Sequence, residues 1–152
     1  MPSSLTTPRV FVPPGFPATA ATIATITGTS FALPIADSYT AILDVGAATG
    51  TTPTLDVAFQ HSPDGGTHWY TFAKFAQVTA VGQRSLIFTP SVAFNQAASE
   101  QAIANTGTAV AINSPVVYSN VRVLATVGGT TPSFATINLW VICAPNGSSL
   151  LS

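Results

Sequence analysis

Apolar and polar side chains alternate along several short stretches of this chain, and a two-residue period is typical of half-buried β-strands. In the stretch YTAILDV, residues 39–45, every second side chain is apolar and falls on one face. Similar strand-like runs occur at 54–62, 67–75, 84–90, 118–127 and 133–144, and residues 21–35 are rich in β-branched side chains. Many short strands separated by turn signals predict an all-β, antiparallel β-sandwich of jelly-roll-like type.

The stretch SFATINLWVICA, residues 133–144, is apolar on both of its predicted faces. One face carries Ala135, Ile137, Leu139 and Val141, and the other carries Phe134, Thr136, Asn138, Trp140 and Ile142. The second face is too apolar to be left fully in water, so we expect a subunit interface at Phe134 and Trp140.

Glycine and proline mark the predicted turns. The tetrapeptide Gly-Thr-Thr-Pro occurs twice, at 50–53 and 129–132, each time between two strand-like runs. Glycine tolerates positive φ and proline starts a strand without an amide donor, so both copies predict turns within hairpins. The run Pro-Asp-Gly-Gly predicts a third turn. The predicted structural turn residues are Gly50, Pro53, Pro63, Asp64, Gly65, Gly66, Gly129 and Pro132.

The distribution of proline predicts how the domain is organised. Residues 1–19 contain five prolines and predict an extended N-terminal arm. Phe11, Val12 and Phe16 give this arm apolar anchors, which we expect to dock on the chain's own domain or on a neighbour. Residues 20–146 form the predicted sandwich, with a long excursion near 91–114 that reads as loop, edge strand or a short helix, and 147–152 form a C-terminal tail.

Charge is scarce in this chain of 152 residues, because only 6% are charged and the net charge is −1. Without a basic stripe or an apolar run of about 20 residues, neither nucleic acid nor a membrane is an expected partner. The N-terminal residues do not have the pattern of a signal peptide. Such a surface fits a stable extracellular-type β domain or, as we prefer, a subunit covered by copies of itself or by a larger lattice.

The residues that bear reactive groups offer few candidate sites. His61, Asp64 and His68 flank one turn and contain metal-ligating groups, but cross-strand pairing and turn capping explain them as well. No nucleophile elbow, phosphate loop or dinucleotide motif occurs, so we expect no enzyme activity and no cofactor.

Cys143, the only cysteine, is expected to be a small buried hydrophobe. Four aromatic side chains have two interpretations, a platform that binds sugar or, as we prefer, the packing of the core and of interfaces. They are Trp69, Tyr70, Phe72 and Trp140.

Two segments, PTLDVAFQHSPDGGTHWYTFAKFAQVT and YSNVRVLATVGGTTPSFATINLWVI, together resemble β-sandwich structural proteins of tailed bacteriophages. The shared pattern is a strand, Ser-Pro-Asp-Gly-Gly and a strand that carries Trp69, followed by Arg122-Val123, a Gly-Thr-x-Pro-Ser-Phe turn at 129–134 and a final strand. Among such proteins, small self-contained chains look like capsid cement or decoration proteins.

This resemblance implies a non-enzymatic structural protein that binds and stabilises the phage capsid shell. It further implies a homo-oligomer, with a trimer favoured, that contacts the major capsid protein. Such a protein is made in the host cytoplasm and resides on the capsid surface of the virion. Two alternatives stay open, a tail, baseplate or fibre module of the virion and a carbohydrate-binding β-sandwich.

Overall fold

The computed structural model describes residues 8–18, 25–34, 36, 38–88, 110–111 and 119–144. Within these residues the chain forms nine β-strands and no helix. The strands are β1 (Arg9–Phe11), β2 (Ile26–Thr27), β3 (Tyr39–Val45), β4 (Ala48–His61), β5 (Tyr70–Lys74), β6 (Gly82–Phe88), β7 (Val110–Ala111), β8 (Val121–Phe134) and β9 (Ile137–Cys143).

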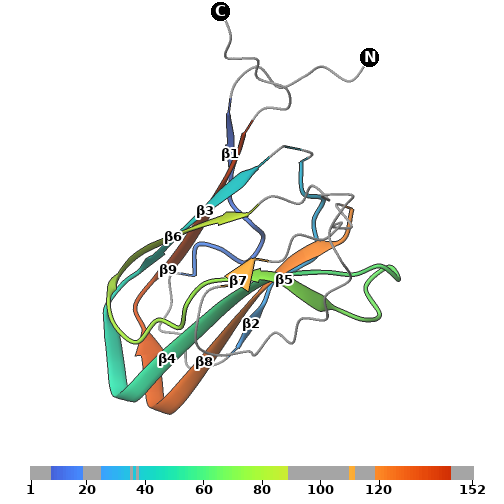
Figure 1. Ribbon diagram of the computed structural model, residues 1–152. Helices are drawn as coiled ribbons and strands as arrows, with labels where there is room; N and C mark the ends of the chain where they lie inside the picture. Colours follow the sequence, from blue (N-terminus) through green and yellow to red (C-terminus); the bar gives the residue numbers. More distant parts are fainter. Residues whose placement is uncertain are drawn as a thin grey trace, which may run out of the picture.

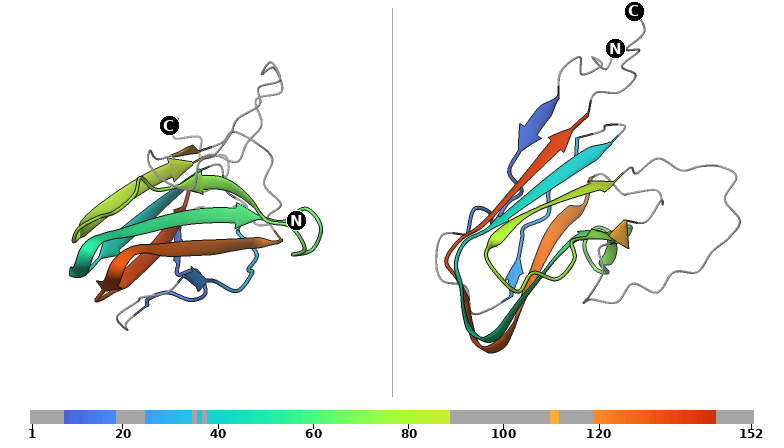
Figure 2. Two further views of the ribbon diagram at one scale, coloured as in Figure 1. Left: turned by 90° about the horizontal axis from the view of Figure 1, so that it is seen from below. Right: turned by 60° about the vertical axis from the view of Figure 1, so that its left-hand side comes forward.

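The strands form two antiparallel sheets that pack against each other as two layers (Figure 2). A four-stranded sheet has the order β1-β9-β3-β6, and a five-stranded sheet has the order β2-β8-β4-β5-β7. The predicted all-β antiparallel sandwich is therefore confirmed. The predicted hairpin across the Pro-Asp-Gly-Gly turn is also present, because β4 pairs with β5.

One long two-stranded ribbon runs through both sheets. β3 pairs with β9 and β4 pairs with β8, and the residue numbers of facing residues have the same sum from Tyr39 opposite Cys143 to His61 opposite Val121, except where Thr51 lies opposite Thr130. Two backbone hydrogen bonds, of 2.8 and 2.9 Å, continue this pairing across the breaks between the strands. The ribbon folds over sharply at one end of the molecule, so that each half belongs to a different sheet (Figure 1).

The two Gly-Thr-Thr-Pro segments lie at this fold and not in hairpin turns, which corrects the prediction from sequence. Both segments lie inside strands, one in β4 and the other in β8, and they face each other across the ribbon. The ladder shifts register on both sides of Thr51, as β-bulges do. We call this paired feature the corner. The glycines and prolines of the corner bend both strands without reversing them. The prediction of a bend at each tetrapeptide is therefore correct, and the prediction of a chain reversal is wrong.

The backbone of the corner is strained in the same way in both copies. Gly50 and Gly129 have φ of 105° and 108°, and Thr52 and Thr131 have φ of 50° and 47°. Positive φ is rare for a β-branched residue and costs on the order of 1 to 3 kcal/mol. The matching values show that the two segments adopt the same backbone conformation.

Close backbone contact explains why glycine occupies the first position of each segment. A Cβ atom on Gly50 would lie 2.4 Å from the carbonyl oxygen of Thr131, and one on Gly129 would lie 2.5 Å from that of Thr52. Real Cβ atoms essentially never approach backbone atoms so closely. The corner therefore requires a residue without a side chain at both positions.

The core lies between the two sheets and follows the predicted alternation. Every second side chain of β3 is buried, as are Leu55, Val57 and Phe59 of β4. At the end away from the corner, aromatic rings join the sheets, and Phe59 of β4 lies 5.3 Å from Phe88 of β6 between ring centroids. Cys143 is buried, as predicted, and burial raises the pKa of its thiol.

The arm docks on its own domain in the part that the structure describes. β1 pairs with β9, and Phe16 packs into the core with 8% of its surface exposed. Of the segment predicted as a long excursion, 91–114, only β7 lies within the described residues, and the predicted tail 147–152 lies outside them.

Candidate functional site

The outer face of the four-stranded sheet carries rows of apolar side chains. Strand register places Val10, Ile142, Thr40 and Ile87 side by side in one row across all four strands. The next row brings Trp140 beside Ile42 and Ser85. We call these two rows, together with Val12, the apolar face. Five of the eight side chains are aliphatic, one is Trp140, and none is charged.

Much of the apolar face is open to solvent. Val10, Val12 and Ile87 are 63%, 44% and 67% exposed, whereas the remaining aliphatic side chains and Trp140 are half-buried. The face ends at a polar row in which Asn138 Nδ2 donates to Asp44 Oδ2 at 3.3 Å. A contiguous apolar patch with a polar border is typical of a protein interaction site.

Only part of the interface predicted from sequence lies on this face. Val12 and Trp140 line one shallow hollow on it. Phe11 is half-buried and packs edge to face on Phe31, with 5.5 Å between ring centroids. Phe16 lies in the core of its own domain, which is one of the two positions expected for an anchor of the arm, and Phe134 is corrected from an interface residue to a core residue.

The burial of Phe134 has a simple geometric reason. Phe134 ends β8, and β9 begins only at Ile137, so the chain bends between them. The predicted alternation placed Phe134 and Trp140 on one face, but the bend turns Phe134 inward, where it has 0% exposure. Trp140 keeps the outward position that alternation within β9 gives it.

The loop 62–69 is organised around Asp64, as its turn chemistry predicts. Asp64 Oδ1 accepts from Ser62 Oγ at 2.8 Å and from the His68 amide at 2.9 Å, and Oδ2 contacts His68 Nδ1. The Ser62 hydroxyl in turn accepts from the Gly66 amide at 2.7 Å. These bonds, above all that from the His68 amide, hold the pKa of Asp64 well below its usual range. Gly65 and Gly66 have the positive φ that the turn predicts, 72° and 103°.

The suggested metal site is not assembled. Asp64 is engaged by His68, whereas the His61 ring packs against Phe72 with 5.5 Å between centroids. Burial lowers the pKa of His61. Among the residues that the structure describes, no group of three or more His, Cys, Asp or Glu is placed to hold a metal ion.

The suggested aromatic sugar platform is likewise dispersed. Phe72 lies in the core at 2% exposure, and Trp140 lies on the apolar face of the other sheet. Trp69 is held against the loop by a 2.9 Å hydrogen bond from Nε1 to the Gly66 carbonyl, and the Arg122 guanidinium lies 4.1 Å over its ring. Only Tyr70, at 55% exposure, remains an open aromatic beside it.

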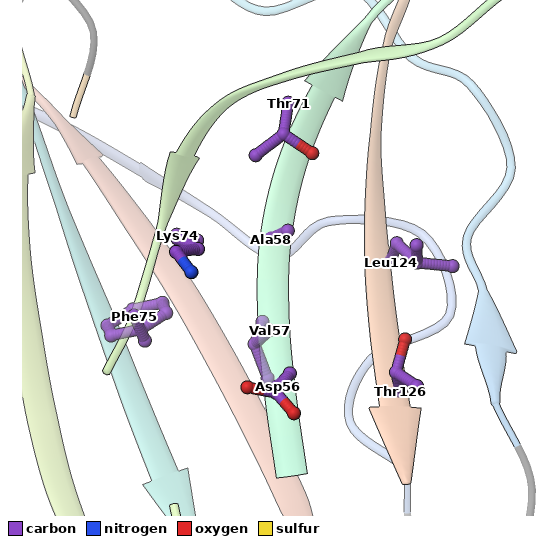
Figure 3. A pocket seen from close by; sticks show the side chains of 8 residues that line it. All are labelled: Asp56, Val57, Ala58, Thr71, Lys74, Phe75, Leu124 and Thr126. Carbon is purple, nitrogen blue, oxygen red and sulfur yellow. The ribbon is translucent and has the colours of Figure 1, made fainter. Parts of the chain in front are cut away.

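A hollow of about 100 Å³ lies on the outer face of the five-stranded sheet (Figure 3). Ala58 lies in its middle, between Lys74 and Leu124, so a small side chain flanked by larger ones creates the space. Asp56, which also lines it, accepts a 2.9 Å hydrogen bond from Gln77. Because ligand pockets usually measure about 300 to 1,000 Å³, this hollow fits a side chain better than a cofactor.

Replacing Asp64 with alanine is expected to loosen the loop 62–69 while leaving the sandwich folded. The variant loses three contacts at once, with the Ser62 hydroxyl, the His68 amide and the His68 ring. The His68 amide loses its acceptor, and the Ser62 hydroxyl that accepts from the Gly66 amide is no longer fixed, so both amides should exchange with solvent faster, which hydrogen-exchange NMR measures. Because the folded pKa of Asp64 is depressed, its contribution is present above its ordinary pKa and is lost as the pH falls through the folded pKa. The control His68→Ala keeps the Ser62 bond and should have a smaller effect, and equal exchange rates in both variants would contradict this role.

Comparisons with known proteins do not identify a relative. No family model, curated protein or solved structure matches the chain. In the described part of the chain, no helix is long and apolar enough to cross a membrane. The candidate function therefore rests on the geometry of the surfaces and on the resemblance in sequence.

Proposed function

We propose that this chain is a non-enzymatic structural protein of a bacteriophage virion that binds and stabilises the capsid shell. The observation that carries this proposal is the apolar face, which presents solvent-exposed aliphatic side chains and no charge. A chain with only 6% charged residues has little to keep such a face from associating. The partner that we propose, the major capsid protein, is inferred from the resemblance to cement or decoration proteins.

The physical basis would be apolar burial repeated over many copies. Burial of one exposed valine or isoleucine side chain contributes on the order of 1.5 to 3 kcal/mol, so a few such residues give only a modest affinity per copy. A shell offers many equivalent sites, and linked copies in the favoured trimer would bind more tightly through multivalency. In this proposal the protein resists expansion of the shell by bridging neighbouring capsid subunits.

The proposal predicts that a charge on the apolar face prevents shell binding. Ile87→Lys should reduce the amount of protein that co-sediments with empty capsids by more than about tenfold, because an unpaired ammonium would be buried in an apolar contact. Val81→Lys is the matched control, because Val81 is 68% exposed and Ile87 is 67% exposed, but Val81 lies outside the apolar face. Thermal unfolding would establish that both variants are folded.

Two outcomes would count against capsid binding. If the unaltered protein does not sediment with capsids, or if Ile87→Lys and Val81→Lys bind equally, the proposed role of this face is wrong. If the protein binds purified tails and not heads, the alternative of a tail, baseplate or fibre module is the better one. A carbohydrate-binding function has no comparable support, because Phe72 lies in the core, Trp140 lies on the other sheet and Arg122 covers one face of the Trp69 ring.

A further inference from the structure

Arg122 is held in one orientation at the loop end of the five-stranded sheet. Its guanidinium carbon lies 4.1 Å from the centroid of the Trp69 ring, and its Nε donates to Gln60 Oε1 at 2.9 Å. Gln60 is fixed in turn, because its Nε2 donates to Thr71 Oγ1 at 3.2 Å. Three neighbouring side chains thus position a cation that would otherwise sample many rotamers.

With Nε engaged by Gln60, the remaining donors of this guanidinium are the N–H groups of its two terminal nitrogens. In the described part of the chain, the terminal nitrogens of Arg122 donate no hydrogen bond, and no carboxylate forms an ion pair with it. Asp64, the acidic residue of the adjacent loop, is engaged by Ser62 and His68. Burial lowers the pKa of Arg122, so the charge is partly removed from water and has more to gain from an anion.

We propose that Arg122, positioned by Trp69 and Gln60, is a binding site for the carboxylate of an acidic side chain on a partner protein. The two terminal amino groups of a guanidinium match the two oxygens of a carboxylate, which gives a paired, charge-assisted contact. A protein partner is favoured over a sugar because Arg122 covers one face of the Trp69 ring and so closes that face to a stacked sugar. The site lies outside the apolar face and does not depend on the proposed function.

The test is an NMR titration of the full chain with N-acetyl-glutamate amide, with sodium chloride at equal ionic strength as the reference. The Trp69 indole N–H and the Arg122 Nε–H signals should shift saturably with the glutamate probe. Arg122→Lys keeps the charge but loses the paired geometry, and should weaken binding by about tenfold. Arg84→Gln removes another arginine, on β6, and should leave the titration unchanged.

Gln60→Glu separates binding from a purely structural role. The new carboxylate would pair with Arg122 inside the protein, so the fold should be kept or stabilised while the probe no longer binds. The proposal is overturned if the probe causes no saturable shift, or if Gln60→Glu binds it as well as the unaltered protein does. It is also overturned if glucuronate binds more tightly than the glutamate probe, since that result would assign the site to an acidic sugar.

Discussion

Gly129→Ala is expected to lower the free energy of unfolding by more than about 3 kcal/mol, an exceptional cost for adding one methyl group. The new Cβ would lie 2.5 Å from the Thr52 carbonyl oxygen, a backbone atom held by the opposite strand of the ribbon. The φ of 108° adds strain for any residue with a side chain. Denaturant unfolding followed by tryptophan fluorescence would measure the loss.

Two control variants separate strain from steric contact. Gly65 also has positive φ, 72°, but a Cβ there would meet nothing within 4 Å, so Gly65→Ala should cost only about 1 to 2 kcal/mol. Gly50→Ala should match Gly129→Ala, because the two positions are equivalent in the corner. Thr131→Asn should keep or raise stability, because asparagine tolerates positive φ. If Gly129→Ala costs no more than Gly65→Ala, the close contact across the corner does not exist.

Phe59→Ala is expected to cost about 3 to 5 kcal/mol, since a large side chain with 0% exposure would leave a cavity. Phe59 touches both sheets, with ring centroids 5.3 Å from Phe88 and 6.3 Å from Phe72. Phe59 lies at the end of the sandwich opposite the corner, where no strand of the ribbon passes from one sheet into the other. The lost stability should therefore come from weaker packing between the two sheets. The same denaturant unfolding experiment applies.

A matched aromatic control is available on the surface. Tyr70→Ala removes a large ring that is 55% exposed and should change the free energy of unfolding much less. If both variants lose similar stability, the aromatic cluster is not the principal link between the sheets at this end. Phe59→Leu, which refills part of the space, should recover a measurable part of the loss.

Local chemistry made much of this fold predictable from sequence. Alternation within 39–45 and 54–59 depends only on neighbouring residues, and it correctly identified the buried faces of β3 and of the second half of β4. The capping role of Asp64 also needs only a few adjacent residues, and it is confirmed. These features could be predicted because the residues that cause them are close in sequence.

The remaining features depend on pairing between distant segments. The corner exists because 50–53 lies opposite 129–132. The sequence of one tetrapeptide does not show that it pairs with the other. The apolar face likewise requires the register that brings Ile142 and Ile87 beside β3. Phe134 was misplaced because periodicity cannot show where a bend resets the alternation.

The register of the folded ribbon is the same before and after the corner, and this couples the lengths of the two chain segments that pair in it, 39–61 and 121–143. A residue deleted between Tyr39 and His61 would shift every later pair and turn inward side chains outward, unless a residue facing the deletion between Val121 and Cys143 were lost as well. Changes of length in this protein should therefore be inherited in compensating pairs within the ribbon.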